Sequence, residues 1–288
     1  MLINSPGEHG SMTTEHRARA FVPGHLSGFF STHRTDDPAK TGSTGAGVAL
    51  AEGVDVFVEP GDGVSLNGEA TTVGAVSRVL DALGVDGAVR IETTLPVGAG
   101  FGVSGAAALG TALAGNRAFD CRQTVNELVT VAHSADVNAE TGLGDVVAQA
   151  RGGASISIHP GAPPHGRADA IPATGRIEYL SRGTLSTRDV LSGDTQTLSA
   201  AGDAALDRLV DDPRMETLMS VSRTFARESG LITPEVQELV DEVTAAGGTG
   251  AMVMLGQTVF ATGTGLTDAG YDPAVTQIHH GGAHLGAE

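Results

Sequence analysis

Glycines at every second position of one short segment could hold a phosphate group. They are Gly98, Gly100 and Gly102, within the segment LPVGAGFGVSGAA of residues 95–107. Glycine lets backbone N–H groups approach a ligand closely, and the positive end of a following helix attracts an anion. Ser104 would lie in the first turn of that helix, where its hydroxyl could reach a Mg²⁺ ion bound to the phosphate. A tight strand-to-helix turn without a ligand is the alternative interpretation.

Three acidic residues follow in a second segment, residues 132–145. Asp136 and Glu140 are four residues apart, which would place both carboxylates on one face of a helix. Asp145 follows Gly144 and precedes a helical run, a position suited to capping a helix. Carboxylates in such a segment could hold Mg²⁺ or accept a proton from a substrate hydroxyl. A solvated acidic face and a helix cap are the alternatives that need no ligand.

Other residue types exclude several kinds of chemistry. Lys40 is the only lysine, and its neighbours lack the glycines of a Walker loop. A pyridoxal Schiff base or a protein-kinase lysine would also have to be Lys40, in a loop-like context. The single cysteine, Cys121, excludes a disulfide framework and a cysteine-based zinc site, and we interpret it as buried packing. His279, His280 and His284 near the C-terminus are more typical of a mobile chain end than of a metal site.

The composition indicates an acidic globular protein. The 288 residues carry 34 acidic and 17 basic side chains, which gives a formal charge of −17. Because such a surface repels phosphate backbones, we expect no nucleic acid and no anionic membrane as partner. Many acids with one lysine and few aromatic residues are typical of halophilic, salt-adapted proteins, and an acidic protein from a GC-rich genome is the alternative. We find no export signal and no apolar run of the about 20 residues that a membrane span requires, so we expect a cytoplasmic protein.

Hydrophobic periodicity predicts an α+β protein of two domains. In the first half we expect strands and helices in alternation, with a loop over residues 32–45. The expected strands are 18–30, broken at Pro23-Gly24, then 47–58 with an internal turn, 89–97 and 153–159. The expected helices are 73–83, which ends at Gly84, then 104–118 and 124–139.

A segment with four prolines, residues 160–175, is the best candidate for a linker. Beyond it we expect one strand, three helices and a hairpin that turns at Gly256-Gln257. Their ranges are 176–181 for the strand, 199–210, 214–228 and 233–246 for the helices, and 250–262 for the hairpin. We therefore predict a disordered leader over 1–17, an N-terminal nucleotide-binding domain over 18–160 and a C-terminal domain over 176–288.

Three motifs in this order resemble those of the GHMP kinases, the family of galactokinase, homoserine kinase and mevalonate kinase. The segment from Pro96 to Ala106 meets every fixed position of that family's phosphate-loop pattern, P-x-G-x-G-[LF]-G-x-S-[GA]-A. Pro23-Gly24-His25 is similar to the N-terminal P-G-[RH] element. Residues 247–250 with 252–256 are similar to the C-terminal glycine-rich hairpin. The family dispenses with a Walker lysine, which agrees with the lysine count.

The resemblance implies a two-domain GHMP kinase fold, with a ribosomal-protein-S5-like α/β domain followed by a ferredoxin-like α+β domain. It also implies ATP and Mg²⁺ as cofactors and a small molecule as the phosphate acceptor. By the match to the phosphate loop, the residues expected to bind the nucleotide are Pro96, Gly98, Ala99, Gly100, Phe101, Gly102, Val103, Ser104 and Gly105.

The resemblance assigns roles to the acidic residues as well. Asp145 matches the aspartate that accepts or orients the proton of the substrate hydroxyl, although some relatives transfer phosphate without a base. Ser104 and Asp136 are the expected Mg²⁺ ligands, with Glu140 as the second choice for the carboxylate. The family usually has a glutamate eleven residues before the aspartate, where this chain has Ser134, so the metal ligand departs from the family pattern.

Three further segments, 20–48, 142–147 and 252–260, look like those of the archaeal pantoate kinases. This similarity implies that the acceptor is pantoate, which is phosphorylated on its primary hydroxyl in coenzyme A synthesis. Homoserine, shikimate or mevalonate as the acceptor, and a sensor without turnover, are the alternatives, and a homodimer is expected by resemblance only. A small carboxylate needs hydrogen-bond donors, which backbone N–H groups of residues 42–47 could supply. The side chains expected to bind the substrate are His25, Ser27, Arg34, Ser43 and Thr44.

Overall fold

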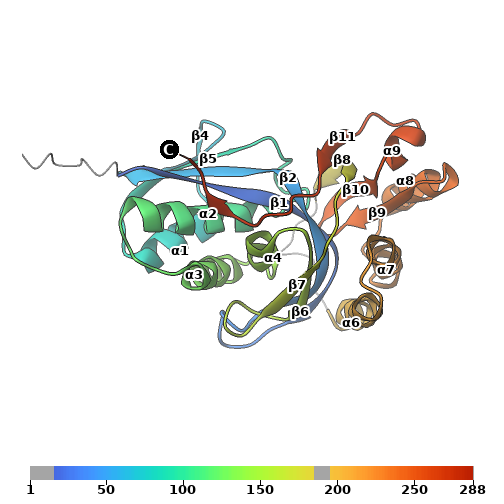
Figure 1. Ribbon diagram of the computed structural model, residues 1–288, viewed down its shortest axis with the longest axis horizontal. Coiled ribbons are helices and arrows are strands. Elements are labelled where there is room, and N and C mark those ends of the chain that lie inside the picture. Colours follow the sequence, from blue (N-terminus) through green and yellow to red (C-terminus); the bar gives the residue numbers. More distant parts are fainter. Residues whose placement is uncertain (1–15, 185–194, 288) are drawn as a thin grey trace, which may run out of the picture.

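The computed structural model describes residues 16–184 and 195–287. Residues 1–15 of the expected leader lie outside the described residues. The described chain forms two halves that lie side by side along the long axis of the molecule (Figure 1). Each half contains one β-sheet with helices packed on it, as the α+β prediction required.

The larger sheet belongs mainly to the first half of the chain and has the strand order β12-β1-β2-β5-β3-β4. In addition, β6 pairs with the first part of β2, and β7 pairs with β6. All of these pairs are antiparallel except β3 with β5. The strands are β1 (Ala18–His33), β2 (Gly42–Pro60), β3 (Val64–Leu66), β4 (Glu69–Thr71), β5 (Gly87–Thr93), β6 (Ala154–His159), β7 (Arg167–Ile171) and β12 (His284–Leu285).

Strands β1 and β2 are longer and less interrupted than predicted. Strand β1 continues through Pro23-Gly24, because the register shift there lets the ladder resume at His25. The loop expected over 32–45 is therefore confined to residues 34–41. The glycines that suggested a loop allow close approach of two backbones instead, since a Cβ at Gly45 would lie 2.3 Å from the oxygen of Phe29. For the same reason residues 47–58 contain no turn and are one strand.

Four helices, α1 (Gly74–Leu83), α2 (Val103–Ala118), α3 (Val125–Asn138) and α4 (Asp145–Arg151), belong to the first half. The first three confirm the predicted helices, and α1 ends at Gly84 with φ +67° as expected. Helix α2 is buried on nearly all sides and consists largely of alanine and glycine. These small residues let it lie against the sheet, since a Cβ at Gly110 would lie 2.4 Å from a methyl group of Val56.

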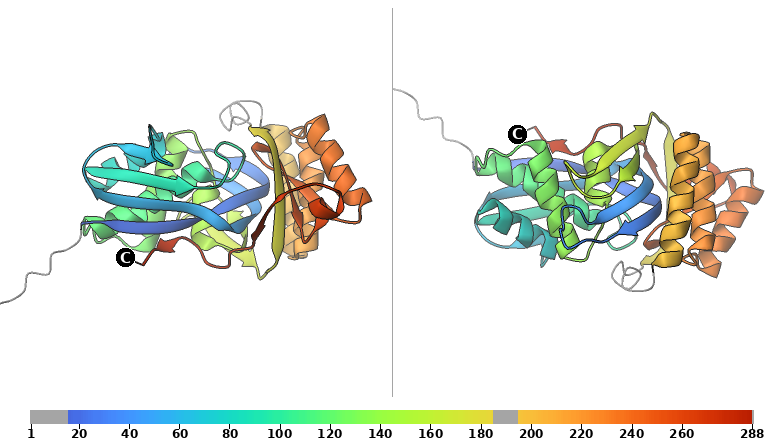
Figure 2. Two further views of the ribbon diagram at one scale, coloured as in Figure 1. Left: turned by 90° about the horizontal axis from the view of Figure 1, so that it is seen from above. Right: turned by 90° about the horizontal axis from the view of Figure 1, so that it is seen from below.

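The second half contains an antiparallel sheet in the order β11-β8-β10-β9. Helices α6, α7 and α8 pack side by side, and Figure 2 shows them at the outer end of the molecule. The predicted hairpin is present, but its turn is Met254-Leu255, two residues earlier than expected. The elements are β8 (Arg176–Thr184), β9 (Thr249–Val253), β10 (Gly256–Thr262), β11 (Ala274–Gln277), α6 (Gln196–Asp211), α7 (Met215–Glu228), α8 (Pro234–Ala245) and α9 (Gly265–Asp268).

The boundary between the two halves differs from the predicted linker. The segment 160–175 includes β7, which pairs with β6 as part of the larger sheet. The chain also returns to that sheet at its C-terminal end, where Ile278 bridges Leu50 and β12 pairs with β1 (Figure 1). Prolines and glycines thus predicted a connection in a segment that contains the five-residue strand β7. Within the described ranges, no helix combines the length and apolar character that crossing a membrane requires.

Candidate active site

The glycine loop connects β5 to α2, as the sequence predicted. Its three alternate glycines all have positive φ, +77° at Gly98, +91° at Gly100 and +66° at Gly102. Gly102 is the N-cap of α2, so it has no side chain that could cap the first N–H groups of a 16-residue helix. Those N–H groups have no intrahelical partner and carry the positive end of the helix dipole. The loop therefore fits a phosphate group.

Several residues expected to bind the nucleotide face the protein instead. The side chains of Ala99, Phe101 and Val103 are buried. Gly105 is also buried, and a Cβ there would lie 3.3 Å from the Cβ atom of Asp145. At these four positions only the backbone is left to contact a ligand.

The rest of the fold holds the loop through its carbonyl oxygens. The backbone N–H of His25 donates to the oxygen of Phe101 at 3.1 Å, and Gln149 Nε2 donates to the oxygen of Gly102 at 3.0 Å. From the second half, Thr258 Oγ1 donates to the oxygen of Ala99 at 3.0 Å. The sequence analysis missed Gln149 and Thr258, because neither is part of a local motif. All three bonds are accepted by backbone carbonyl oxygens of the loop, and none of them uses a backbone N–H group of the loop.

Asp136 lies beside the loop and is only 2% exposed, so the interpretation as a solvated acidic face was wrong. Its Oδ1 accepts hydrogen bonds from Ser104 Oγ at 3.2 Å and from Thr141 Oγ1 at 2.6 Å. Burial raises the pKa of Asp136 to about 6, and the charge of Asp145 contributes to the increase. A cation at this position would stabilise the ionised carboxylate. Ser104 and Asp136 thus fit a metal ligand pair.

Glu140 does not share a helix face with Asp136, contrary to the sequence analysis. Helix α3 ends at Asn138, and Glu140 has φ +57° and an exposed side chain. In the described part of the chain, no group of three or more His, Cys, Asp or Glu side chains could hold a metal ion by itself. Mg²⁺ is commonly bound by one or two carboxylates together with substrate phosphates, and this pattern suits Ser104 with Asp136.

The Gly-Leu-Gly turn before Asp145 consists of close contacts that exclude side chains. A Cβ at Gly142 would lie 2.1 Å from a carboxylate oxygen of Asp136, and one at Gly144 would lie 2.3 Å from Ser43 Oγ. The turn therefore brings the two aspartates to one place, with Ser43 beside them. Asp145 itself is the first residue of α4.

The carboxylate of Asp145 forms a cluster with two side chains of β1. Its Oδ1 lies 2.9 Å from His25 Nδ1 and 3.5 Å from Ser27 Oγ. Because an ionised carboxylate only accepts, Nδ1 carries the proton of this bond. The other ring nitrogen lies 3.4 Å from Ser155 Oγ. Register shifts on both sides of His25 and Ser27 bend β1 at this point and place their side chains on one face.

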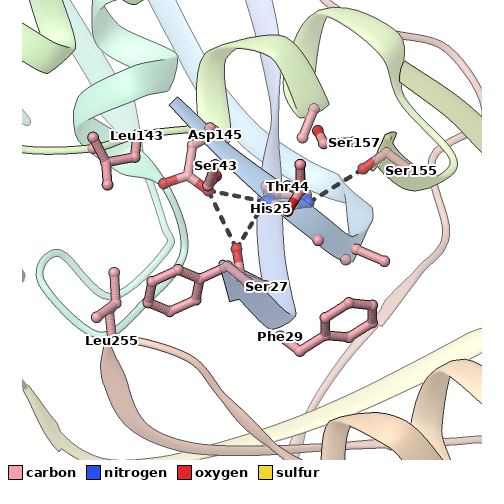
Figure 3. Close-up of a pocket in the computed structure, with 17 residues that line it drawn as sticks. His25, Ser27, Phe29, Ser43, Thr44, Leu143, Asp145, Ser155, Ser157 and Leu255 are labelled. Carbon is pink, nitrogen blue, oxygen red and sulfur yellow. Dashed lines mark hydrogen bonds and ion pairs between the residues drawn. The ribbon is translucent and has the colours of Figure 1, made fainter. Parts of the chain in front are cut away.

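This cluster lines a small cavity of about 50 Å³. Predicted residues in the lining are His25, Ser27, Ser43, Thr44 and Asp145. Ser155 and Ser157 of β6 also line it, on the far side of His25 from Asp145 (Figure 3). Their alternation in the sequence GASISIH indicates one face of a strand, a signal that could have identified them. The apolar lining includes Phe29, Phe30, Leu143 and Leu255.

Two of the expected substrate contacts are not in place. Arg34 is exposed on the loop after β1 and is not part of the cavity lining. The backbone N–H groups of residues 42–47 belong to β2, where Gly45 and Gly47 pair with β1 on one side and with β6 on the other. A strand that is paired on both sides uses its N–H groups in the two ladders. The N–H of Ser43 donates to the oxygen of Leu143, so these N–H groups already have partners within the protein.

The remaining groups considered in the sequence lie apart from this cavity. Cys121 is half-buried beyond the end of α2, and burial raises the pKa of its thiol. The rings of His279 and His284 lie 6.3 Å apart, and both contact Phe21. None of these residues lines the cavity.

Comparison with known proteins agrees with this geometry. Residues 70–153 match the family model described as the GHMP kinases N terminal domain. A curated pantoate kinase of Thermococcus kodakarensis is 36% identical over 84% of this chain and 86% of its own length. A pantoate kinase of Methanospirillum hungatei is 33% identical over 86% of this chain and 88% of its own length. A solved structure described as a phosphotransferase related to the CoA biosynthesis pathway superimposes with a TM-score of 0.83 at 30% identity, over 94% of this chain and 98% of that chain.

Proposed function

The chain belongs to the GHMP kinase family, in the branch that contains the curated pantoate kinases, and from this premise we propose that it phosphorylates pantoate. The phosphoryl group of ATP is transferred to the primary hydroxyl of pantoate, which yields 4-phosphopantoate and ADP. The hydroxyl loses its proton, and the bond between the γ-phosphorus and the bridging oxygen of ATP breaks.

The glycine loop binds the phosphates of the nucleotide through backbone N–H groups from Gly98 to Gly105. Positive φ at Gly98, Gly100 and Gly102 supports this role, because side chains there would be strained and would also narrow the cradle. Ser104 Oγ and the Asp136 carboxylate hold the metal. When bound, Mg²⁺ and ATP supply the phosphoryl group and offset the charge that develops on it.

Asp145 accepts the proton of the substrate hydroxyl. Its Oδ1 is engaged by His25 and Ser27, and we assign Oδ2 to the substrate. His25 is a positioning residue, since both of its ring nitrogens lie near protein groups. It orients the carboxylate and does not itself touch the reacting atoms. A Cβ at Gly47 would lie 2.5 Å from its Nε2, and this close packing against the β2 backbone leaves the ring little freedom to turn.

The carboxylate of pantoate binds at the other end of the cavity. Hydroxyl groups of Thr44, Ser155 and Ser157 line that region and can donate hydrogen bonds to an anion. Arg34 is not assigned a role there, because it lies outside the lining.

One observation carries the proposal. Asp145 lies between the phosphate loop and the cavity. Its carboxylate lines the cavity, and its Cγ would lie only 3.2 Å from a Cβ atom added at Gly102 of the loop. A nucleotide on the loop and a hydroxyl in the cavity would therefore meet at this one carboxylate, which is the arrangement that in-line transfer requires.

The test is release of ADP from Mg-ATP with D-pantoate in about 2 M KCl, because salt screens the self-repulsion of so acidic a chain. Homoserine, shikimate and mevalonate serve as parallel acceptors. Turnover that depends on pantoate supports the proposal. Turnover on another acceptor would replace pantoate and keep the kinase, and binding of ATP without turnover on any acceptor would indicate a sensor.

A further inference from the structure

The turn between β9 and β10 has an unusual residue in an unusual conformation. Leu255 has φ +64°, in the left-handed region where glycine and asparagine are common and a bulky apolar residue is rare. Strained residues of this kind persist where the surrounding structure fixes them, often at functional sites. A role for the Leu255 side chain would account for this conformation.

The turn is held from two directions. The N–H of Met254 donates to the oxygen of Ser27 at 2.8 Å, which ties the turn to β1. On the other side, a Cβ at Gly256 would lie 2.0 Å from the oxygen of Ala99, and a Cβ at Gly100 would lie 2.9 Å from the oxygen of Met254. The turn thus lies between the acceptor cavity and the phosphate loop, and its backbone has little room to move.

This placement puts the side chain of Leu255 into the lining of the cavity. In Figure 3, Leu143 and Leu255 lie on the side of Asp145 that faces away from Ser155 and Ser157. Leu143 and Leu255 therefore give the cavity an apolar wall on one side of Asp145, and Ser155 and Ser157 give it hydroxyl groups on the other side. An acceptor that fits has an apolar carbon beside the carbon that bears the hydroxyl, and its anionic group farther away.

We propose that Leu255 determines acceptor specificity by packing against a branched apolar carbon next to the reacting carbon. The inference rests on the proposed function, since pantoate has this pattern: two methyl groups on carbon 3, beside the carbon 4 that carries the primary hydroxyl. Leu143 lines the cavity on the same side of Asp145. Glycine or asparagine would form this turn with less backbone strain. On this proposal the strained leucine is kept because its side chain lines the cavity.

A purely structural role for Leu255 makes the opposite prediction. If the residue only formed the turn, Leu255→Asn and Leu255→Gly would relieve strain and leave acceptor preference unchanged. Asn is close to Leu in size and tolerates the left-handed region, so Leu255→Asn changes the polarity of the cavity wall with little change of shape. Arg122→Asn is the matched control, at φ +61° in an exposed position.

The experiment measures kcat/KM for D-pantoate and for 2,4-dihydroxybutanoate, which lacks the two methyl groups and keeps both hydroxyls and the carboxylate. For the wild type we expect a preference for pantoate of about 10- to 100-fold, the usual discrimination by small apolar groups. We expect Leu255→Asn to lower kcat/KM for pantoate by about tenfold or more and that for the analogue by less than about threefold. The KM for ATP stays within about twofold if the phosphate loop is intact.

Each result separates the inference from the proposed function. A collapsed preference in Leu255→Asn and Leu255→Gly, with Arg122→Asn like the wild type, supports the role of Leu255. A wild type that uses pantoate, with the same preference in both Leu255 variants, overturns the inference and leaves the function standing. A parallel fall for both acids also overturns it, because it indicates a general distortion. A wild type that phosphorylates neither acid overturns both.

Discussion

The phosphate side and the acceptor side of the site are built in different ways. The phosphate side is one contiguous stretch, residues 96–105, and it offers mainly backbone groups at glycines of positive φ. The acceptor side consists of side chains from five separated segments of the chain, which contribute Ser27, Thr44, Asp145, Ser155 and Leu255 among others. Both sides meet at Asp145.

The difference has a physical cause. Binding a phosphate requires N–H groups in one local conformation, so the requirement falls on consecutive residues. Binding one particular acceptor requires side chains around a small volume, and strand pairing can bring these from anywhere in the sequence. We therefore expect substitutions on the phosphate side to act through backbone geometry, and those on the acceptor side to act through one side chain at a time.

The largest effect is expected for Gly100→Val, which adds a side chain where the phosphate side requires a glycine backbone conformation. Strain at φ +91° costs about 1–3 kcal/mol, and the contact of the new Cβ at 2.9 Å from the oxygen of Met254 adds overpacking of about 1–3 kcal/mol. We expect ATP affinity, measured by calorimetry, to fall by more than about 100-fold.

Gly270→Val is the matched control for this loss. Gly270 has φ +90°, and a Cβ there would meet nothing within 4 Å in the described structure. The control variant carries the same backbone strain without the collision, so it should bind ATP as the wild type does. Equal loss of ATP affinity in both variants would show that strain alone, and not the geometry of the loop, is responsible.

The next largest effect is expected for Asp145→Asn, which removes a proton acceptor and keeps the shape of the side chain. General base catalysis contributes about 10²–10⁴-fold, so kcat should fall within that range while the KM for ATP stays within about threefold. Asp86→Asn, an exposed residue before β5, serves as control. Retention of full kcat would show that transfer proceeds by positioning alone, and the two sides would then not meet at a base.

The position of the glycine loop between β5 and α2 could be predicted from the sequence. The pattern from Pro96 to Ala106 is local, and the helix that follows starts one residue earlier than expected. Ser104 and Asp136 were also proposed together, and they are hydrogen-bonded. The burial of Asp136 was missed, because an aspartate four residues before a glutamate looks like an exposed face until the end of α3 is known.

The acceptor side could be predicted only in part. Ser27, Ser43 and Thr44 were proposed and line the cavity, whereas Leu255 was not, because its place depends on where the β9–β10 turn falls. The same limit applies to β1 and β2, where the proline and glycine residues predict breaks that the strands do not have. These residues permit bulges and close backbone approach, and single-sequence patterns do not distinguish those uses from a loop.

A third substitution, Asp136→Asn, tests whether the carboxylate beside the phosphate side lowers the stability of the fold. The pKa of Asp136 is about 6 in the folded protein, against an ordinary value of 3.8 for an aspartate, so the folded state keeps the proton to higher pH than the unfolded chain does. Folding stability therefore falls as pH rises from about 4 to about 6, by an amount of order 3 kcal/mol that persists above pH 6. Asn at this position has no such penalty and can still accept the bond from Ser104.

We accordingly expect Asp136→Asn to raise Tm by several degrees at pH 7.5 without ligand, and to give no increase near pH 4. The same variant should lose at least about tenfold in Mg²⁺-dependent turnover. Thermal unfolding across this pH range and assays across Mg²⁺ concentrations provide the two readouts. A lower Tm at pH 7.5 would mean that hydrogen bonds to the charged carboxylate outweigh the cost of its burial.

The smallest effects are expected from single hydroxyls on the acceptor side, and a pair of variants measures them. Ser157 lines the cavity from β6, so Ser157→Ala should raise the KM for pantoate by about 2- to 10-fold, the value of one hydrogen bond of about 0.5–1.5 kcal/mol. Arg34 lies outside the lining, and Arg34→Ala should change that KM by less than about twofold even though it removes a positive charge, because an exposed charge is screened at high salt. A large effect of Arg34→Ala with none of Ser157→Ala would reverse the assignment. The carboxylate of the acceptor would then bind at the mouth of the cavity, with its apolar carbon toward β6, and Leu255 would face the wrong end of the substrate.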